Sequence, residues 1–174
     1  SSINGKKVGS LSDSAIFSFC GNKVLTTGEG GAVVTNSKNI YDKLKLISSH
    51  GRMDQTSYFN NQNQSDYVGL GYNWRMSSFA AGLGISQLNK LDKIIKMRQK
   101  NALFLSNRLS KIPELTVPEP PPGFDHIYQM YTIRLKNKKI RNMLHEYLTK
   151  KRIFSKIYFS PIHLTKFYQN KYDL

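Results

Sequence analysis

The chain has 174 residues, of which 39% are hydrophobic, enough for one ordinary domain with an apolar core. Its 26 Lys and Arg residues outnumber the 11 Asp and Glu residues and give a formal charge of +15 at pH 7. Cys20 is the single cysteine, which excludes an internal disulfide framework, and no apolar run reaches the about 18 residues of a membrane-spanning helix. These features predict a cytoplasmic protein without a membrane partner.

The positive charge is spread along the whole chain. Its densest runs, 136–141 and 150–152, flank segments with helical patterns. A basic excess of this size can indicate a nucleic-acid partner, but the sequence has no zinc-finger spacing, RNA-recognition aromatic signature or basic region with heptads. We therefore expect no nucleic acid to bind. A basic nucleic-acid-binding module is the alternative from a different functional class.

Strands and loops surround one helix in the first part of the chain. Residues 14–19 form an apolar, aromatic-rich run that predicts a buried strand, and residues 39–48 carry apolar side chains at helical spacing. The other predicted elements here are a loop over 20–27, a glycine turn over 28–31, a strand over 32–35 and a long polar loop over 49–71.

A long helix dominates the second part of the chain. We predict it over 77–112, because apolar residues recur on one face, Ser77 and Ser78 can cap its start, and Pro113 follows its end. The elements predicted after it are a connector over 118–123, a half-buried strand over 131–135, a helix around 143–148 and a strand over 153–159. The alternation of helices and strands predicts an α/β fold.

Ser18 and Lys23 have the clearest chemical potential. The first predicted strand ends at Phe19 and delivers both residues into one polar loop, which continues as Thr-Thr-Gly-Glu-Gly-Gly. A lysine amine that is held in place can form a Schiff base with a carbonyl, and a serine on the same loop can hold an anionic group such as a phosphate. The glycines allow close backbone approach. Taken alone, a lysine in a loop is more often a solvated charge.

Residues 17–31, Phe-Ser-Phe-Cys-Gly-Asn-Lys-Val-Leu-Thr-Thr-Gly-Glu-Gly-Gly, closely resemble the cofactor-lysine segment of nucleotide-sugar aminotransferases of the DegT family. The Gly-Asn-Lys version is most similar to that of perosamine synthases. The resemblance implies that Lys23 binds pyridoxal 5'-phosphate (PLP) covalently and that Ser18 contacts the PLP phosphate. Cys20 stands where the family usually has an aromatic residue or His, so we assign it no catalytic role and expect a small buried thiol.

Further segments resemble motifs of the same family in the same order. They are 8–13 before the cofactor strand, 50–51, Gly-Tyr-Asn-Trp-Arg-Met over 71–76, 84–88 in the long helix, 126–131 and 158–163. By resemblance, Asn73 reaches the PLP phosphate of the neighbouring subunit in a homodimer with shared active sites, and Arg75 can face a substrate phosphate. From spacing alone, Asn73 could simply turn the chain and Arg75 could be a structural ion-pair partner. We interpret His50 and His163 as hydrogen-bonded structural residues.

The resemblance implies a fold-type I PLP-dependent transferase of the aspartate-aminotransferase-like class. The chain would hold the C-terminal part of the PLP-binding large domain over 1–88, a connecting helix over 89–112 and an incomplete small C-terminal α/β domain over 113–174. We expect both ends to be truncated. The family's ring-stacking group, pyridinium-pairing acid and phosphate loop would lie before Ser1, and the chain stops at Leu174 without an element that closes the small domain. No metal site is predicted.

The function implied by the resemblance is transfer of an amino group from an amino acid, glutamate in this family, to a nucleotide-linked keto-sugar in surface-polysaccharide or glycan biosynthesis. Lys23 would move the proton between the Cα of the amino acid and the C4′ carbon of the cofactor. We expect the chain to be inactive alone. The alternative is a catalytically silent sugar-nucleotide-binding or regulatory relative, which Lys23 disfavours because silent members and the related dehydratases lack this lysine.

Overall fold

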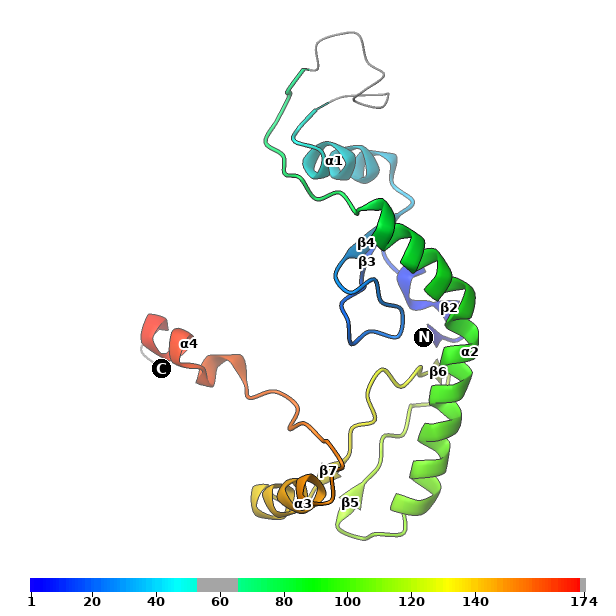
Figure 1. Ribbon diagram of the computed structural model, residues 1–174, viewed down its shortest axis with the longest axis vertical. Coiled ribbons are helices and arrows are strands. Elements are labelled where there is room, and N and C mark those ends of the chain that lie inside the picture. Colours follow the sequence, from blue (N-terminus) through cyan, green and yellow to red (C-terminus); the bar gives the residue numbers. More distant parts are fainter. Residues whose placement is uncertain (53–65, 173–174) are drawn as a thin grey trace. The chain divides into compact units, whose positions relative to one another are not determined.

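The computed structural model describes residues 1–52 and 66–172 (Figure 1). The chain divides into two compact units. The first comprises Ser1–Lys100 and Pro120–Gln129, and the second comprises Asn101–Glu119 and Met130–Leu174. The first unit therefore contains every residue to which the sequence assigns a site role.

A small antiparallel sheet joins the start of the chain to a distant segment. β1 (Ser2–Ile3) pairs with β2 (Lys6–Lys7) on one side and with β6 (Phe124–Asp125) on the other. A short 3-10 helix, η1 (Val8–Ser10), follows β2. The pairing of β6 with β1 explains why residues 120–129 belong to the first unit.

The second strand pair carries the predicted site loop at one end. β3 (Ser14–Ser18) and β4 (Gly31–Thr35) pair antiparallel, with Ile16 opposite Val33. Both strands predicted in this region are thus confirmed. The prediction that the first strand is buried is wrong for this chain, because the pair forms a two-stranded sheet and Ile16 at its centre is 82% exposed.

Two helices begin in the first unit at serine caps. α1 (Lys38–Ser48) is preceded by Ser37, whose Oγ accepts a backbone N–H of the first turn at 3.4 Å. α2 (Ser78–Leu109) is preceded by Ser77, whose Oγ accepts a backbone N–H of its first turn at 3.2 Å. Such caps satisfy amide groups that lack a partner within the helix. Both predicted helices are confirmed, although α2 ends before the predicted limit.

The second unit contains the last turns of α2, one strand pair and further helices. β5 (Leu115–Thr116) pairs antiparallel with β7 (Arg134–Leu135). α3 (Lys138–Lys150) confirms the helix predicted in this region. A 3-10 helix, η3 (Ile162–Leu164), and α4 (Lys166–Tyr172) follow.

Two strands predicted in the second unit differ from the structure. The strand predicted over 131–135 is confirmed only at Arg134–Leu135. The strand predicted over 153–159 is wrong: these residues have no regular secondary structure, and their side chains are exposed. A strand persists where a second strand completes its backbone hydrogen bonds. Within the described chain, no strand pairs with residues 153–159.

The hydrophobic core is much smaller than the composition predicts. Among the described residues, the buried apolar side chains are Val24, Ala102 and Val117, and Thr27 is the buried polar one. Large apolar side chains remain in solvent instead; Phe79, for example, is 94% exposed. Helix and strand faces with the pattern of buried elements therefore have no covering layer within the described chain. None of the helices in residues 1–52 and 66–172 is long and apolar enough to cross a membrane.

Candidate functional site

Figure 1 shows the loop that connects β3 to β4. Lys23 lies in this loop, because β3 ends at Ser18 and β4 begins at Gly31. Its backbone N–H donates to the carbonyl of Cys20 at 2.9 Å and closes a tight turn. Phe19 joins the two ends of the loop, since its N–H donates to the carbonyl of Gly30 at 2.8 Å and its carbonyl accepts the N–H of Thr27 at 2.9 Å. The predicted cofactor lysine is therefore carried by a closed, hydrogen-bonded loop.

Two threonines hold the returning half of this loop. Thr26 Oγ1 donates to the carbonyl of Phe19 at 3.1 Å and accepts the N–H of Gly28 at 3.0 Å. Thr27 is buried, and its Oγ1 donates to the carbonyl of Glu29 at 2.6 Å. The hydroxyls thus satisfy backbone groups that no strand ladder satisfies. Sequence reasoning missed these roles; the signal was a Thr-Thr pair directly before the glycine turn.

Two glycines turn the chain back toward β4. Gly28 and Gly30 have φ angles of 82° and 141°, a region that residues with a Cβ rarely adopt. A Cβ on Gly30 would also lie 2.8 Å from Thr27 Oγ1 and 3.2 Å from Met76 Cε. The prediction that glycines here allow close approach is confirmed. The proximity of Met76 further shows that the segment just before α2 packs against the lysine loop.

Ser18 stands at the base of the loop as the last residue of β3. Its Oγ accepts the backbone N–H of Cys20 at 3.4 Å, so its own hydroxyl proton can still be donated to a ligand. The Cys20 thiol is half-buried rather than buried as predicted, and its Sγ donates to Glu29 Oε1 at 3.7 Å. The partial exposure is explained by this carboxylate neighbour, which has to stay in contact with water.

Lys23 itself is half-buried. Within residues 1–52 and 66–172, no hydrogen bond or ion pair engages its ammonium group. Its backbone, by contrast, is held by a side chain that sequence reasoning missed. Gln129 accepts the N–H of Val24 at 2.9 Å and donates to the carbonyl of Asn22. The one sequence signal for this residue was its place inside the motif over 126–131.

Asn73 and Arg75 form a second group of predicted site residues. Arg75 Nε donates to Asn73 Oδ1 at 3.0 Å, and Arg75 Nη2 lies 3.4 Å from His50 Nε2. The contact agrees with the interpretation of His50 as a hydrogen-bonded structural residue. The described hydrogen-bond partners of Arg75 are therefore the Asn73 amide and the His50 imidazole. The alternative in which Arg75 forms a structural ion pair would need a carboxylate as the partner.

The backbone around Asn73 is tied to the end of α1. Ser49 and Asn73 form an antiparallel bridge, and the N–H of His50 donates to the carbonyl of Tyr72 at 2.9 Å. In such an extended segment, side chains alternate between two sides. The rings of Tyr72 and Trp74 accordingly stack with centroids 4.3 Å apart and an interplanar angle of 5°. Asn73 and Arg75 share the other side, where they meet each other.

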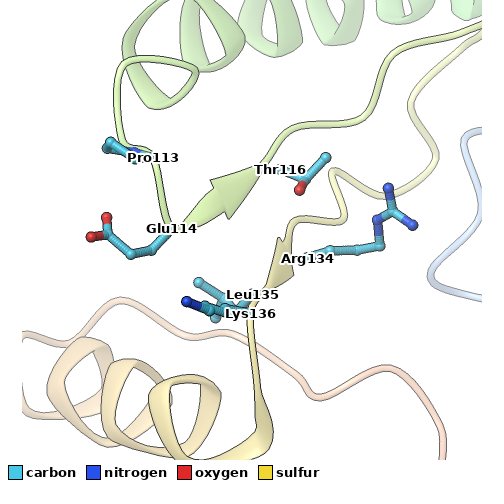
Figure 2. Close-up of a pocket in the computed structure, with 6 residues that line it drawn as sticks. All are labelled: Pro113, Glu114, Thr116, Arg134, Leu135 and Lys136. Carbon is cyan, nitrogen blue, oxygen red and sulfur yellow. The ribbon is translucent and has the colours of Figure 1, made fainter.

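A surface pocket of about 530 Å³ lies in the second unit, away from these residues in sequence (Figure 2). It is lined by residues of β5, β7 and their flanks: Pro113, Glu114, Thr116, Arg134, Leu135 and Lys136. Figure 2 shows that the charged ends of Glu114 and Arg134 point away from one another. Because its polar groups do not converge, this pocket does not have the character of a catalytic site.

The whole chain matches one known protein family. The sequence profile of the DegT/DnrJ/EryC1/StrS aminotransferase family covers residues 1–174. The chain belongs to this family. Membership confirms the resemblance inferred from residues 17–31 and from the motifs that follow them. The family is PLP-dependent, so PLP is the cofactor expected here.

Named members of the family show what the chain is similar to. It is 32% identical over 173 residues to the GDP-perosamine synthase of Escherichia coli O157:H7, covering 99% of this chain and 45% of that protein. It is 44% identical over 111 residues to the UDP-4-amino-4,6-dideoxy-N-acetyl-beta-L-altrosamine transaminase of Campylobacter jejuni strain 81-176, covering 64% of this chain and 28% of that protein. The chain thus spans less than half the length of these curated relatives.

A solved structure of the family confirms the predicted fold. The aminotransferase PseC of Helicobacter pylori, described as involved in the biosynthesis of pseudoaminic acid, superposes with a TM-score of 0.87 at 30% identity. The match covers 98% of this chain and 45% of PseC. The chain therefore has the α/β fold of the fold-type I transferases, over less than half of such a molecule.

Proposed function

We propose that this chain acts as part of a PLP-dependent aminotransferase that moves an amino group from glutamate to a nucleotide-linked keto-sugar in surface-polysaccharide or glycan biosynthesis. The observation that carries the proposal is the placement of Lys23 in a closed loop with Ser18 at its base, in a chain that matches an aminotransferase family along its whole length. The nucleotide is left open, because the named relatives include both GDP-linked and UDP-linked enzymes.

The residues of the loop fit a phosphorylated aldehyde such as PLP. Lys23 supplies a primary amine with no described partner, and Ser18 supplies a hydroxyl proton that the backbone contact leaves available. Gly28 has a positive φ angle and no atom within 4 Å of the place of a Cβ, so a ligand can approach the backbone closely there. This combination of amine, hydroxyl and glycine turn supplies part of the donor set that a PLP site uses.

Lys23 and Ser18 have separate tasks in the proposed reaction. Bound PLP supplies an electron sink for the bonds at the Cα of an amino acid. Lys23 Nζ would hold the cofactor between turnovers and would serve as the base that moves a proton at the Cα of the amino donor. Ser18 Oγ would donate to the phosphate and so help to hold the cofactor near Lys23.

Asn73 and Arg75 are proposed to act as a pair. In a homodimer with shared sites, Asn73 would donate from Nδ2 to the PLP phosphate of the neighbouring subunit. The contact with Arg75 Nε supports this role, because it occupies Asn73 Oδ1 and leaves the amide protons to face the ligand. Arg75 has five N–H donors in about one plane, so N–H groups remain for a phosphate of the substrate.

The proposed division into domains follows the family. Residues 1–88 would belong to the PLP-binding large domain, residues 89–112 would be the connecting helix, and residues 113–174 would belong to the small domain. The continuity of α2 (Ser78–Leu109) supports a helical connection. A nucleotide-sugar substrate and one half-buried free thiol both fit a cytoplasmic location.

We further propose that the isolated chain does not turn over substrate. A PLP site also needs a carboxylate for the pyridinium nitrogen and a group stacked on the ring, which the family supplies from a segment that precedes the cofactor lysine. The exposed apolar faces of β3 and α2, with Ile16 82% and Phe79 94% exposed, support the idea that a further layer covers them in the working enzyme.

The proposal is tested by amino transfer from labelled glutamate. The full-length protein that carries this chain would be incubated with PLP and ¹⁵N-glutamate, and 2-oxoglutarate would be measured with and without a keto-sugar nucleotide. We expect stoichiometric 2-oxoglutarate without the sugar and catalytic amounts with it, and neither from Lys23→Ala. Sugar-nucleotide binding without 2-oxoglutarate would support the silent relative instead. Robust turnover by the 174-residue chain alone would contradict the proposed dependence on other segments.

A further inference from the structure

A chain of contacts runs from helix α2 to the backbone of the lysine loop. It begins at Arg98, in the part of α2 that belongs to the first unit. Arg98 Nη1 lies 3.2 Å from the carbonyl of Tyr128 and 3.3 Å from the carbonyl of Gln129, and donates to both. A guanidinium group that bonds two successive carbonyls fixes the direction of that short piece of backbone. The backbone of Gln129 is therefore positioned by a rigid helix.

The side chain of Gln129 contacts the backbone on both sides of Lys23. Its Oε1 accepts the backbone N–H of Val24 at 2.9 Å, and its Nε2 donates to the backbone carbonyl of Asn22. The two contacts join residues that are 105 and 107 positions apart in the sequence. One amide thus binds the peptide groups immediately before and after Lys23.

These two contacts define the direction in which Lys23 leaves the loop. The carbonyl of Asn22 belongs to the peptide plane before Lys23, and the N–H of Val24 belongs to the plane after it. Fixing both planes fixes φ and ψ of Lys23, and with them the Cα–Cβ bond. The hydrogen bond from Lys23 N–H to the Cys20 carbonyl at 2.9 Å holds the same residue from within the loop. The side chain of Lys23 is left to be placed by its own rotamers.

We propose that Gln129 is a positioning residue for the cofactor lysine: its amide binds the backbone on both sides of Lys23 and fixes the direction in which the side chain leaves the loop. The inference rests on the proposed role of Lys23. A glutamine suits this task because one planar amide carries both a donor and an acceptor. Hydrophobic residues of the same length have neither, and a carboxylate has the acceptor alone.

The test uses the full-length protein with Gln129→Met and a matched control, Gln99→Met. Gln99 lies next to Arg98 on α2 and also makes two contacts with the segment before β7, to Asp125 Oδ1 at 2.7 Å and to the carbonyl of His126 at 3.1 Å. The control therefore removes two hydrogen bonds, both donated by Gln99 Nε2, from residues close to Gln129 without touching the loop. It separates a general loosening of residues 120–129 from loss of the Gln129 contacts themselves.

Two readouts are measured on each variant. Hydrogen–deuterium exchange reports the Val24 amide in the absence of PLP, and borohydride reduction at timed intervals reports how fast Lys23 becomes attached to added PLP. In Gln129→Met we expect the Val24 amide to exchange roughly threefold to tenfold faster. We expect the attachment of PLP to Lys23 to be slower by a similar factor, which is the size expected for lost hydrogen bonds. In Gln99→Met neither rate should change. We also expect kcat to fall more than KM rises in Gln129→Met.

A second variant separates the two contacts. Gln129→Glu keeps an acceptor for Val24 and removes the donor to Asn22, so Val24 should stay protected while attachment at Lys23 slows. The proposed positioning role would be overturned if the exchange rate of the Val24 amide were unchanged in Gln129→Met. It would also be overturned if Gln99→Met changed both rates as much as Gln129→Met. Failure of Lys23 to react in the unmodified protein would instead overturn the proposed function, and the exchange at Val24 would still decide whether Gln129 holds the loop backbone.

Discussion

The Nε of Arg75 donates to the Oδ1 of Asn73 at 3.0 Å, so the amide of one predicted site residue is oriented by the other. The remaining described contact of Arg75, with His50 Nε2 at 3.4 Å, ties this pair to the residues that follow α1. An asparagine with its oxygen occupied presents its two amide protons outward. This arrangement agrees with the proposed role of the pair at the cofactor phosphate, and on that proposal the loss of either side chain should weaken cofactor binding.

We expect Arg75→Lys to weaken PLP binding by the full-length protein roughly threefold to tenfold, the loss of about one hydrogen bond of 0.5–1.5 kcal/mol. Lysine keeps the positive charge but has no Nε–H in a rigid plane, so it cannot orient the Asn73 amide in the same way. Titration of the apo protein with PLP measures the effect. Arg108→Lys is the control, because Arg108 lies over the Phe104 ring at 4.2 Å in the second unit. Equal affinities of the Arg75 variant and the unmodified protein would contradict the prediction.

A comparison of two glycines tests the geometry of the lysine loop. Gly30→Ala should destabilise the protein by about 1–3 kcal/mol, because Gly30 has a φ of 141° and its new Cβ would lie 2.8 Å from Thr27 Oγ1. Gly82→Ala should stabilise the 174-residue chain by about 0.5–1 kcal/mol, since Gly82 lies within α2 and a Cβ there meets nothing within 4 Å. Chemical denaturation of the two variants of this chain gives both values. Similar changes in the two variants would show that the loop does not have this conformation.

The exposed apolar faces predict how the isolated 174-residue chain behaves in solution. With Ile16 82%, Phe79 94% and Phe154 89% exposed, we expect it to self-associate and to bind a hydrophobic dye. Sedimentation velocity at several concentrations measures the first property, and dye fluorescence measures the second. If the chain stayed monomeric at every concentration and did not bind the dye, the idea that another protein layer covers these apolar faces would be contradicted.

Local patterns in the sequence predicted much of the fold. The apolar spacing over residues 39–48 and 77–112 led to α1 and α2 because amphipathic periodicity and serine caps are local properties. The strands β3 and β4 were likewise predicted from two short apolar runs on either side of a glycine turn, whereas their antiparallel pairing is shown by the structure. The signals that predict these elements lie within the elements themselves.

Burial and pairing were predicted less well, because they depend on partners that are distant in sequence. Residues 14–19 and 153–159 have the composition of buried strands, yet the first is exposed and the second forms no strand. A pattern shows which face an element would bury, whereas a covering layer or a neighbouring strand has to be supplied by other residues.

The residues of the candidate site also divide into those that local motifs predict and those that depend on distant contacts. Lys23, Ser18, Asn73 and Arg75 were predicted from motifs, and the structure places them in two hydrogen-bonded groups within the first unit. Gln129 could not be predicted, since its contacts with Asn22 and Val24 span more than half of the chain. The local sequence around a glutamine does not predict which backbone groups it will hydrogen-bond.

The most direct test of the central claim is to identify the residue that binds PLP. The full-length protein would be incubated with PLP, reduced with borohydride, digested and mapped by mass spectrometry, with Lys23→Arg as the control. The account predicts a phosphopyridoxyl group on Lys23 and none in the control. An unmodified Lys23 in folded protein with excess PLP would contradict the account and favour a relative that binds a sugar nucleotide without catalysing amino transfer.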